Sequence, residues 1–341
     1  MKKILNLLKF LYLGITTVDK YLFRFLYFLV FRPKAKVLSI GNLSMGGTGK
    51  TPVLFALLKE ILKCKKAGQV CVLSRGYRSP WENSFYFLRG TGPHPSQLTD
   101  EAVLFNQKFE EVPLLLGKRR DRSARYAETR LNPEILLLDD GFQYRRLHKD
   151  FEIVLWDSHT KPEEAQLIPA GRLREPVSRL READVILLTR CESATKVQVK
   201  FWQKWLAEVA PGIRIVPMQT ICDGLYDHEG KRVLSLPKEV IAMSAIGRPA
   251  SFYLQLRQLG INVVHKTEFR DHHHFKGTEL EKMAALHRQS GLPVVCTEKD
   301  RVKISAEDAA KVGLITLRIR VAPASGNSLF SEIPGLSDLC R

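Results

Sequence analysis

The sequence predicts an α/β fold: a parallel sheet with helices on both faces, followed by a smaller C-terminal α/β domain. Two observations predict it. Short apolar runs rich in Val, Ile and Leu alternate with amphipathic stretches along the chain, and a second series of the same alternation begins near residue 212. Near-continuous apolar strands that alternate with helices are typical of parallel sheets buried on both faces. The 341 residues are enough to form both parts.

The first series contains six expected strands, at 36–40, 69–74, 112–116, 134–138, 151–156 and 184–189. Amphipathic helices such as 52–66 and 100–110 are expected between them. In the second series, "RIVPMQTICDGLYD" reads as strand and turn, and "EVIAMSAIGRPASFYLQLRQLGINVVHKTEF" as strand, helix and strand. Two more strands are expected in "LPVVCTEKDRVKI" and "GLITLRIRV". We therefore expect three parts: an amphipathic segment at 1–33, the main domain at 34–212, and a smaller domain at 213–341.

The composition is that of a folded protein with a strong positive charge. Lys and Arg number 53 against 36 Asp and Glu, which gives a formal net charge of +17. Such an excess indicates a polyanionic partner: nucleic acid, an anionic lipid surface or a phosphorylated substrate. The six cysteines form no CxxC pair and no zinc-site spacing with His, so we interpret them as reduced thiols in a cytosolic protein.

The N-terminal segment mixes apolar and basic residues. In "KKILNLLKFLYLGITTVDKYLFRFLYFLVFRPKAK" two apolar runs are broken by charges, and neither reaches the roughly 20 apolar residues of a spanning helix. Leucines and aromatics interleaved with Lys and Arg favour a helix that lies in a membrane interface. The alternative is a helix packed on the protein's own core.

The stretch "SIGNLSMGGTGKTPV" predicts a phosphate-binding loop. It follows an apolar strand and precedes a helix, and it fits G-x-x-x-x-G-K-[ST] with Ser44 in place of the first Gly. Glycines allow backbone N–H groups to converge on phosphate oxygens, Lys50 would reach the β- and γ-phosphates, and the Thr51 hydroxyl would bind Mg²⁺. We assign nucleotide binding to the whole loop: Ser44, Met45, Gly46, Gly47, Thr48, Gly49, Lys50 and Thr51.

A second acidic group for the metal is expected at the end of another strand. The run "EILLLDDGFQ" places Asp139 and Asp140 directly after apolar residues. A carboxylate at this position can hold Mg²⁺ directly or through water. Together with Thr51, these two residues are the predicted metal ligands.

Two further segments have both a structural and a catalytic interpretation. Asp100 and Glu101 follow Thr99, and this pattern is also that of a helix N-terminus, with a capping residue and acidic residues in the first turn. In "FRDHHHF" the adjacent histidines would point in different directions, which disfavours a shared metal and fits an exposed turn. A histidine near a carboxylate is nevertheless the arrangement used to remove a proton from a hydroxyl. Three basic clusters, at 117–126, 144–149 and 170–182, suit an anionic substrate.

The combination of these motifs resembles the tetraacyldisaccharide 4'-kinase family of lipid A biosynthesis. The matching segments are "GNLSMGGTGKTP", "SRGYR", "DDGFQ", "IPAGRLREP", "AIGRPASFY", "FRDHHHF" and "TEKDRVK". The family usually has Ser or Thr at the loop's first position, in agreement with Ser44, whereas Tyr144 stands where the family has His.

The resemblance implies a P-loop NTPase-like kinase that uses ATP and Mg²⁺. It would transfer the γ-phosphate to the 4'-hydroxyl of a tetraacyldisaccharide 1-phosphate. Asp100 and His272 would act on that hydroxyl, Lys50 would neutralise the phosphoryl group, and arginines of the basic clusters would hold the 1-phosphate. The enzyme would be attached, peripherally or monotopically, to the cytoplasmic face of the bacterial inner membrane, with no nucleic-acid partner.

Two alternatives come from other functional classes. A membrane-recruited P-loop ATPase switch that acts on a protein partner would explain the loop, the Asp strand and the N-terminal segment, although not the His-rich segment. A nucleic-acid-dependent ATPase rests on the net charge alone and predicts stimulation by DNA or RNA that salt weakens.

Overall fold

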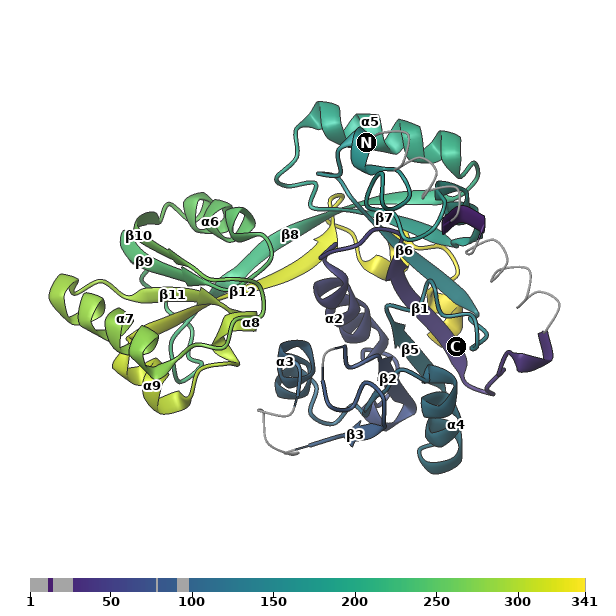
Figure 1. Ribbon diagram of the computed structural model, residues 1–341, viewed down its shortest axis with the longest axis horizontal. Helices are drawn as coiled ribbons and strands as arrows, with labels where there is room; N and C mark the ends of the chain where they lie inside the picture. Colours follow the sequence, from purple (N-terminus) through teal and green to yellow (C-terminus); the bar gives the residue numbers. More distant parts are fainter. Residues whose placement is uncertain (1–11, 15–26, 78, 91–97, 341) are drawn as a thin grey trace. The chain divides into compact units, whose positions relative to one another are not determined.

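The computed structural model describes residues 12–14, 27–77, 79–90 and 98–340 (Figure 1). The chain divides into two compact units. The first comprises Met1–Pro93, Phe109–Gln219 and Val321–Arg341, and the second comprises His94–Lys108 and Thr220–Arg320. Among the described residues, no helix has the length and apolar character needed to span a bilayer.

The first unit is built on a mostly parallel sheet with the strand order β8-β7-β6-β1-β5-β2-β4-β3. Neighbouring strands pair in parallel, and only the edge strand β3 pairs antiparallel, with β4. The six expected strands are all present, whereas β3 was not expected. The strands are β1 (Lys36–Asn42), β2 (Val70–Ser74), β3 (Tyr86–Leu88), β4 (Leu114–Leu116), β5 (Ile135–Asp139), β6 (Phe151–Asp157), β7 (Val185–Thr189) and β8 (Arg214–Tyr226).

Helices cover both faces of this sheet (Figure 1). On one face, Val37 and Leu136 pack against Ala124 and Ala127 of the helix α4. Side chains alternate along a strand, so Leu38, next to Val37, points to the opposite face, where α2 lies. The helices and short 3₁₀ turns of this unit are α2 (Lys50–Ile61), α4 (Arg120–Arg130), α5 (Lys196–Val209), α10 (Leu329–Glu332), η1 (Tyr27–Leu29), η2 (Ala67–Gln69), η4 (Pro162–Glu164), η5 (Val177–Glu182) and η6 (Ser337–Cys340).

The second unit repeats the α/β principle on a smaller scale, with the parallel order β10-β9-β11-β12. Val240 and Ala242 of β9 pack with Phe252 of α6, whereas Ile241 of the same strand packs with Met283 of α7 on the other face. The elements are α3 (Asp100–Lys108), β9 (Glu239–Ser244), α6 (Pro249–Gln258), β10 (Asn262–Glu268), α7 (Gly277–Ser290), β11 (Val294–Thr297), α8 (Glu298–Arg301), α9 (Ala306–Lys311) and β12 (Leu314–Pro323).

The compact units differ from the expected ranges 34–212 and 213–341 in three segments. Residues 94–108, with α3, group with the second unit, and residues 213–219 and 321–341 group with the first. The physical reason is that β8 and β12 each run from one unit into the other. A single cut in the sequence therefore cannot separate the two.

Most of the N-terminal segment 1–33 lies outside the described residues. Of the described part, Tyr12 and Leu13 pack against a core cluster that includes Leu173, and the Tyr12 hydroxyl donates to the carbonyl oxygen of Arg174 at 2.7 Å. Phe28 is 70% exposed. The described residues thus include both core packing and an exposed apolar side chain.

Candidate functional site

Four neighbouring parallel strands of the first unit end in polar residues at the same edge of the sheet. β1 ends at Asn42, β5 at Asp139, β6 at Asp157 and β7 at Thr189, and these strands are adjacent in the order β7-β6-β1-β5. In the register of the sheet, Asp157 lies beside Thr189, and Asp139 lies beside Ile40 of β1. Because ligands of such folds bind beyond the carboxyl ends of the strands, this edge is a candidate site.

The glycine-rich loop leads from β1 into α2 at this edge. Gly46 has φ 104° and Gly49 has φ 86°, values that favour glycine because an L side chain is strained there. A Cβ on Gly46 would also lie 2.6 Å from Nη2 of Arg172. The helix begins at Lys50, with Pro52 in its first turn where no N–H donor is needed.

Carbonyl oxygens of the loop are bound by protein donors. The guanidinium of Arg172 donates to the Met45 carbonyl at 3.1 Å, and that of Arg190 donates to the Gly47 carbonyl at 2.7 Å. The Thr189 hydroxyl donates to the carbonyl of Thr48 at 3.0 Å. Carbonyl oxygens would repel a phosphate, so these bonds favour a loop that presents its N–H groups to an anion.

Lys50 and Asp140 face each other beside the loop. The ammonium nitrogen of Lys50 lies 3.0 Å from Asn42 Oδ1 and 3.4 Å from Asp140 Oδ1, and Arg174 contacts both Asp140 oxygens at 3.1 and 3.3 Å. Burial alone would raise the pKa of Asp140, but the charges of Lys50 and Arg174 outweigh it and lower that pKa to about 2. The carboxylate is therefore ionised at physiological pH.

The predicted metal ligands lie at the same edge of the first unit. Thr51 is half-buried in the first turn of α2, and Asp139 ends β5, where the Ser74 hydroxyl donates to its carboxylate at 2.9 Å. No group of three His, Cys, Asp or Glu side chains that could hold a metal is found in the described part of the chain. A hydroxyl with one or two carboxylates still fits Mg²⁺, which keeps waters and takes phosphate oxygens as its other ligands.

In the second unit, Asp100 does not cap its own helix. The Thr99 hydroxyl accepts a hydrogen bond from the Ala102 N–H at 3.3 Å and takes that role. The Asp100 carboxylate instead accepts from Nδ1 of His272 at 3.1 Å. The two interpretations of the segment therefore apply to different residues: Thr99 caps α3, and Asp100 is paired with a histidine.

Two of the three adjacent histidines point to different partners, as the sequence indicated. His273 contacts Glu279 at 2.8 Å and stacks on Phe269, whereas His272 faces Asp100. His272 also has φ 63°, a rare conformation for a residue other than glycine. Such backbone strain is concentrated at functional sites.

The pKa values of the Asp100–His272 pair are shifted in opposite directions. The hydrogen bond to Asp100 raises the pKa of His272, against the lowering effects of burial and of Lys299. Burial acts to raise the pKa of Asp100, but the hydrogen bond from His272 and the charges of Lys303 and Lys299 lower it below its ordinary value. Opposite shifts of this kind keep the carboxylate ionised beside an imidazole that can take or give a proton.

Several arginines of the basic clusters are structural. Arg179 is buried and Arg145 is partly buried, and both pair with Glu175, at 3.5 and 2.6 Å. Arg172 and Arg174 hold the glycine-rich loop and Asp140, as described above. Tyr144, whose hydroxyl donates to the Asp121 carboxylate, also lies under the guanidinium of Arg120, 4.1 Å from the ring centre.

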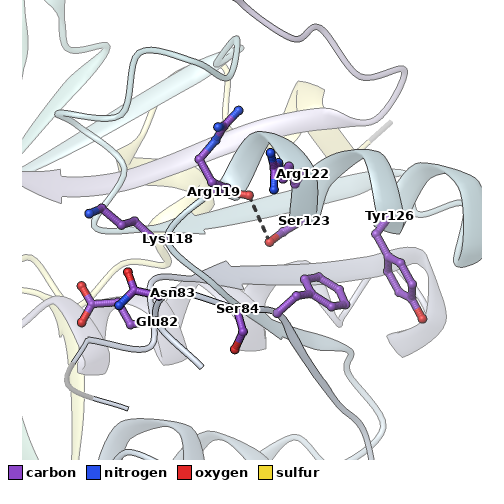
Figure 2. A pocket seen from close by; sticks show the side chains of 9 residues that line it. Glu82, Asn83, Ser84, Lys118, Arg119, Arg122, Ser123 and Tyr126 are labelled. Carbon is purple, nitrogen blue, oxygen red and sulfur yellow. Dashed lines mark hydrogen bonds between the residues drawn. The ribbon is translucent and has the colours of Figure 1, made fainter. Parts of the chain in front are cut away.

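The cluster at 117–126 lines a pocket of about 520 Å³ at the start of α4 (Figure 2). Lys118 and Arg119 lie toward one end and Tyr126 toward the other. Phe85 contacts Tyr126, with ring centres 4.8 Å apart. The lining residues are Glu82, Asn83, Ser84, Phe85, Lys118, Arg119, Arg122, Ser123 and Tyr126.

Sequence reasoning missed the partners of the predicted residues. Asn42, Arg190 and Asp157 had no assigned role, although all three lie at strand ends of the kind described above. Lys299 and Lys303 lie in "TEKDRVK", a segment that was noted only for its resemblance. Their contacts with Glu101 and Asp100 are between segments about 200 residues apart, which no local pattern indicates.

Comparisons with known proteins agree with one another. Residues 1–333 match the sequence pattern of the family described as LpxK, tetraacyldisaccharide-1-P 4'-kinase. The tetraacyldisaccharide 4'-kinase of Halothermothrix orenii is 33% identical over 297 residues, 82% of this chain and 76% of its own. That of Bdellovibrio bacteriovorus is 32% identical over 310 residues, 89% of this chain and 90% of its own. The crystal structure of LpxK from Aquifex aeolicus in complex with ATP, 28% identical, superposes with a TM-score of 0.74 and covers 96% of this chain and 97% of its own.

Proposed function

Because the chain belongs to the tetraacyldisaccharide-1-P 4'-kinase family, it is an ATP-dependent lipid A kinase, and we propose that Lys50, Asp100 and His272 carry its reaction. The γ-phosphate of ATP passes to the 4'-hydroxyl of a tetraacyldisaccharide 1-phosphate. The main support for these roles is the Asp100–His272 hydrogen bond. This bond is not required to cap α3, because Thr99 does so, and neither side chain is part of the apolar core.

The loop Ser44–Thr51 binds the phosphates of ATP. Its bonded carbonyl oxygens support this role, because they turn the donor side of the backbone toward an anion. Lys50 reaches the β- and γ-phosphates, exchanging its contact with Asp140 for the nucleotide. Since the transition state spreads charge over the phosphoryl oxygens, catalysis by this loop consists of positioning and charge neutralisation.

Asp100 accepts the proton of the 4'-hydroxyl as the oxygen attacks the γ-phosphorus. His272 orients the carboxylate through Nδ1 and polarises it. A positioned base of this kind contributes about 10²- to 10⁴-fold to the rate of proton transfer. The sugar must therefore present its hydroxyl to Asp100 rather than to water.

Mg²⁺ is the proposed cofactor beside ATP. Thr51 and one carboxylate of Asp139 and Asp140 would hold it, and when bound it would neutralise phosphoryl oxygens. Asp140 is the stronger candidate because it already lies against Lys50. We expect Asp140→Asn to raise the magnesium concentration needed for half-maximal rate more than Asp139→Asn does. Equal effects of the two substitutions would contradict this choice.

The pocket at the start of α4 is the proposed site for the 1-phosphate of the lipid. Lys118 and Arg122 supply positive charge on its lining, where Arg119 is paired with Asp121, and the Phe85–Tyr126 pair supplies an apolar wall. This combination suits an anionic head group attached to apolar chains. Peripheral or monotopic attachment to the cytoplasmic face of the membrane is proposed from the N-terminal segment and the net charge of +17.

The alternative of an ATPase switch is not favoured by the family to which the chain belongs. It predicts ATP hydrolysis that rises with bare lipid vesicles and no phosphorylated lipid. The kinase predicts a labelled lipid product.

The test is transfer of labelled γ-phosphate from ATP to tetraacyldisaccharide 1-phosphate in detergent micelles. Asp100→Asn should reduce kcat by 10²-fold or more while ATP affinity persists. Thr99→Ala should lower stability by about 1 kcal/mol through loss of the cap, with turnover largely kept. The matched control is Glu307→Gln, a change of an exposed carboxylate on α9 of the same unit. Full turnover by Asp100→Asn would exclude its role as the base.

A further inference from the structure

A buried lysine lies between Asp100 and a second carboxylate in the second unit. The ammonium nitrogen of Lys303 is 3.5 Å from Asp100 Oδ2 and 3.0 Å from Asp300 Oδ1, and the Lys303 side chain is only 2% exposed. The Asp100 side chain is 8% exposed and that of Asp300 is fully buried. The contacts thus run in series from Asp300 through Lys303 and Asp100 to His272.

Local structure holds Asp300, the first member of this series, in place. Thr297 caps the short helix α8, and its hydroxyl donates to Asp300 Oδ2 at 2.8 Å. Lys303, two residues beyond α8, also reaches the Ala245 carbonyl at 3.4 Å, and its ammonium lies 5.6 Å from the centre of the Phe275 ring. The ammonium group is therefore held from several sides and has little freedom to leave Asp100.

The same segment supplies a second cation to the start of α3. Lys299 pairs with Glu101 at 2.8 Å and lies 3.4 Å from Nε2 of His272. The acidic residues 100 and 101 are thus each matched by one lysine of "EKDRVK". Beyond these two lysines, the charged groups that face the Asp100–His272 pair are Glu101 on α3, Asp271 next to His272, and Asp300 on α8.

A purely structural role of Lys303 would not require two carboxylate partners. Asp300 alone would satisfy a buried lysine, at the shorter distance of 3.0 Å. A second carboxylate within 3.5 Å is not needed to offset the cost of burying the Lys303 ammonium group. Its presence is explained if the charge and the direction of that second carboxylate, Asp100, matter. Asp100 has to be both ionised and aimed at a hydroxyl, and a fixed cation on its inner side secures both.

We propose that Lys303 is a positioning residue for Asp100: anchored by Asp300, it holds the carboxylate ionised and directed toward the sugar hydroxyl. This rests on the proposed role of Asp100 as the base. In this proposal Lys303 acts only through Asp100.

The experiment compares variants that remove the cation with variants that keep it. Lys303→Met alone would leave Asp300 buried without its partner, so the main variant is Lys303→Met combined with Asp300→Asn, and Asp300→Asn alone retains the lysine. Lys303→Gln, which keeps a donor without the charge, gives the same comparison if the double variant does not fold. The control is Lys311→Met, which removes an exposed lysine paired with Glu307 on α9.

Two measurements separate positioning from folding. In the double variant we expect kcat to fall by about tenfold or more, the KM for ATP to stay within about twofold, and the acid limb of the pH–rate profile to move upward by about one pH unit. The second measurement is the titration of the Asp100 carboxyl by ¹³C NMR, assigned with Asp100→Asn. Removal of the cation should move this titration to higher pH. Asp300→Asn, which keeps the cation and removes a nearby negative charge, should not move it to higher pH, and Lys311→Met should leave it within a few tenths of a unit.

The two proposals can fail separately. A double variant with the wild-type pH profile and kcat, or one whose kcat falls while the Asp100 titration stays in place, would overturn the role of Lys303. Full turnover by Asp100→Asn would instead remove the base assignment, and the carboxyl titration would still report whether Lys303 controls the charge of Asp100.

Discussion

At the residue scale, unusual backbone conformations coincide with the groups that make the key contacts. Among the described residues other than glycine, positive φ occurs at Asn132, Asp140, Arg190 and His272. Asp140 pairs with Lys50, Arg190 holds the Gly47 carbonyl, and His272 pairs with Asp100. Such conformations cost on the order of 1–3 kcal/mol each for residues other than glycine. Their positions support functional placement of these three side chains.

The Asp100–His272 pair gives a pH prediction with a definite sign. The pKa of His272 is raised by Asp100, so the stability that the hydrogen bond contributes is full below the ordinary histidine pKa of about 6.5 and fades as the pH rises through the folded-state value. At high pH, the contact with Lys303 is the main interaction of Asp100 that the substitution Asp100→Asn removes. The substitution should therefore destabilise the protein most below about pH 6.5 and less above it.

The measurement is the free energy of unfolding in urea across pH 5–9, together with an NMR titration of the His272 ring. In Asp100→Asn the pKa of His272 should fall, since the main cause of its elevation is removed. A destabilisation that grows with rising pH, or an unchanged His272 titration, would contradict the assignment of the pair.

At the element scale, the site depends on where strands end and helices begin. Parallel strands β7, β6, β1 and β5 place four polar ends side by side, and the glycine-rich loop turns from β1 into α2 over them. The loop can take this path because Gly46 and Gly49 adopt conformations that other residues resist. The chemistry thus follows from strand order and from two backbone conformations.

Gly49 and Gly212 offer a matched pair of substitutions. Their φ values are 86° and 81°, and an added Cβ would meet nothing within 4 Å at either position. Alanine should therefore cost about 1–2 kcal/mol of stability at both, through backbone strain alone. Only Gly49→Ala should also weaken ATP binding, by about tenfold or more, because it shifts the N–H groups of the loop. Thermal unfolding and ATP titration by calorimetry make the comparison, and equal ATP affinity in the two variants would contradict the role of the loop.

Helix α4 offers a second element-scale test. Arg122 lines the pocket, whereas Arg130 is exposed in the last turn of the same helix. Arg122→Ala should raise the KM for tetraacyldisaccharide 1-phosphate by about tenfold, and Arg130→Ala should leave it unchanged, because a lost charge-assisted contact costs about 1.5–3 kcal/mol. Kinetics with a substrate that lacks the 1-phosphate provide the check: Arg122→Ala should then behave as wild type. An equal loss on both substrates would place the phosphate elsewhere.

At the scale of the whole molecule, charge and an exposed apolar residue support the proposed attachment to an anionic membrane surface. The net charge is +17, and Phe28, near the end of the N-terminal segment, is 70% exposed. Basic residues contribute attraction that salt screens, and an aromatic side chain contributes burial that salt does not screen. Binding to lipid should therefore have two separable parts.

Vesicle sedimentation tests this division. Binding to vesicles that contain anionic lipid should exceed binding to zwitterionic vesicles and should fall as NaCl is raised. Phe28→Asp should weaken binding at every salt concentration by about tenfold or more, whereas Leu234→Asp, at an exposed position in the second unit, should have no such effect. Equal losses in the two variants would show that Phe28 has no particular part in membrane attachment.

Some elements were not predicted from the sequence, and for two of them the local signal is weak. β3 has three residues at a sheet edge, too few for an alternating pattern. α4 was read only as a basic cluster, because its buried face consists of small residues and of paired charges such as Asp121 rather than of large apolar side chains. The limits of the two units also differ from the expected ranges, since β8 and β12 belong to both.

Local patterns in the sequence are enough to establish the α/β class, the phosphate-binding loop and the family: strand and helix periodicity, glycine spacing and short motifs in a fixed order. They also indicate Thr99 as the cap of α3. Which side chains meet depends on the tertiary structure, which pairs Asp100 with His272 and Lys303 and places Arg145 and Arg179 against Glu175. The physical reason is that ion pairs and hydrogen bonds form wherever the packing of strands and helices brings charges together, and the distance between residues along the chain does not encode that packing.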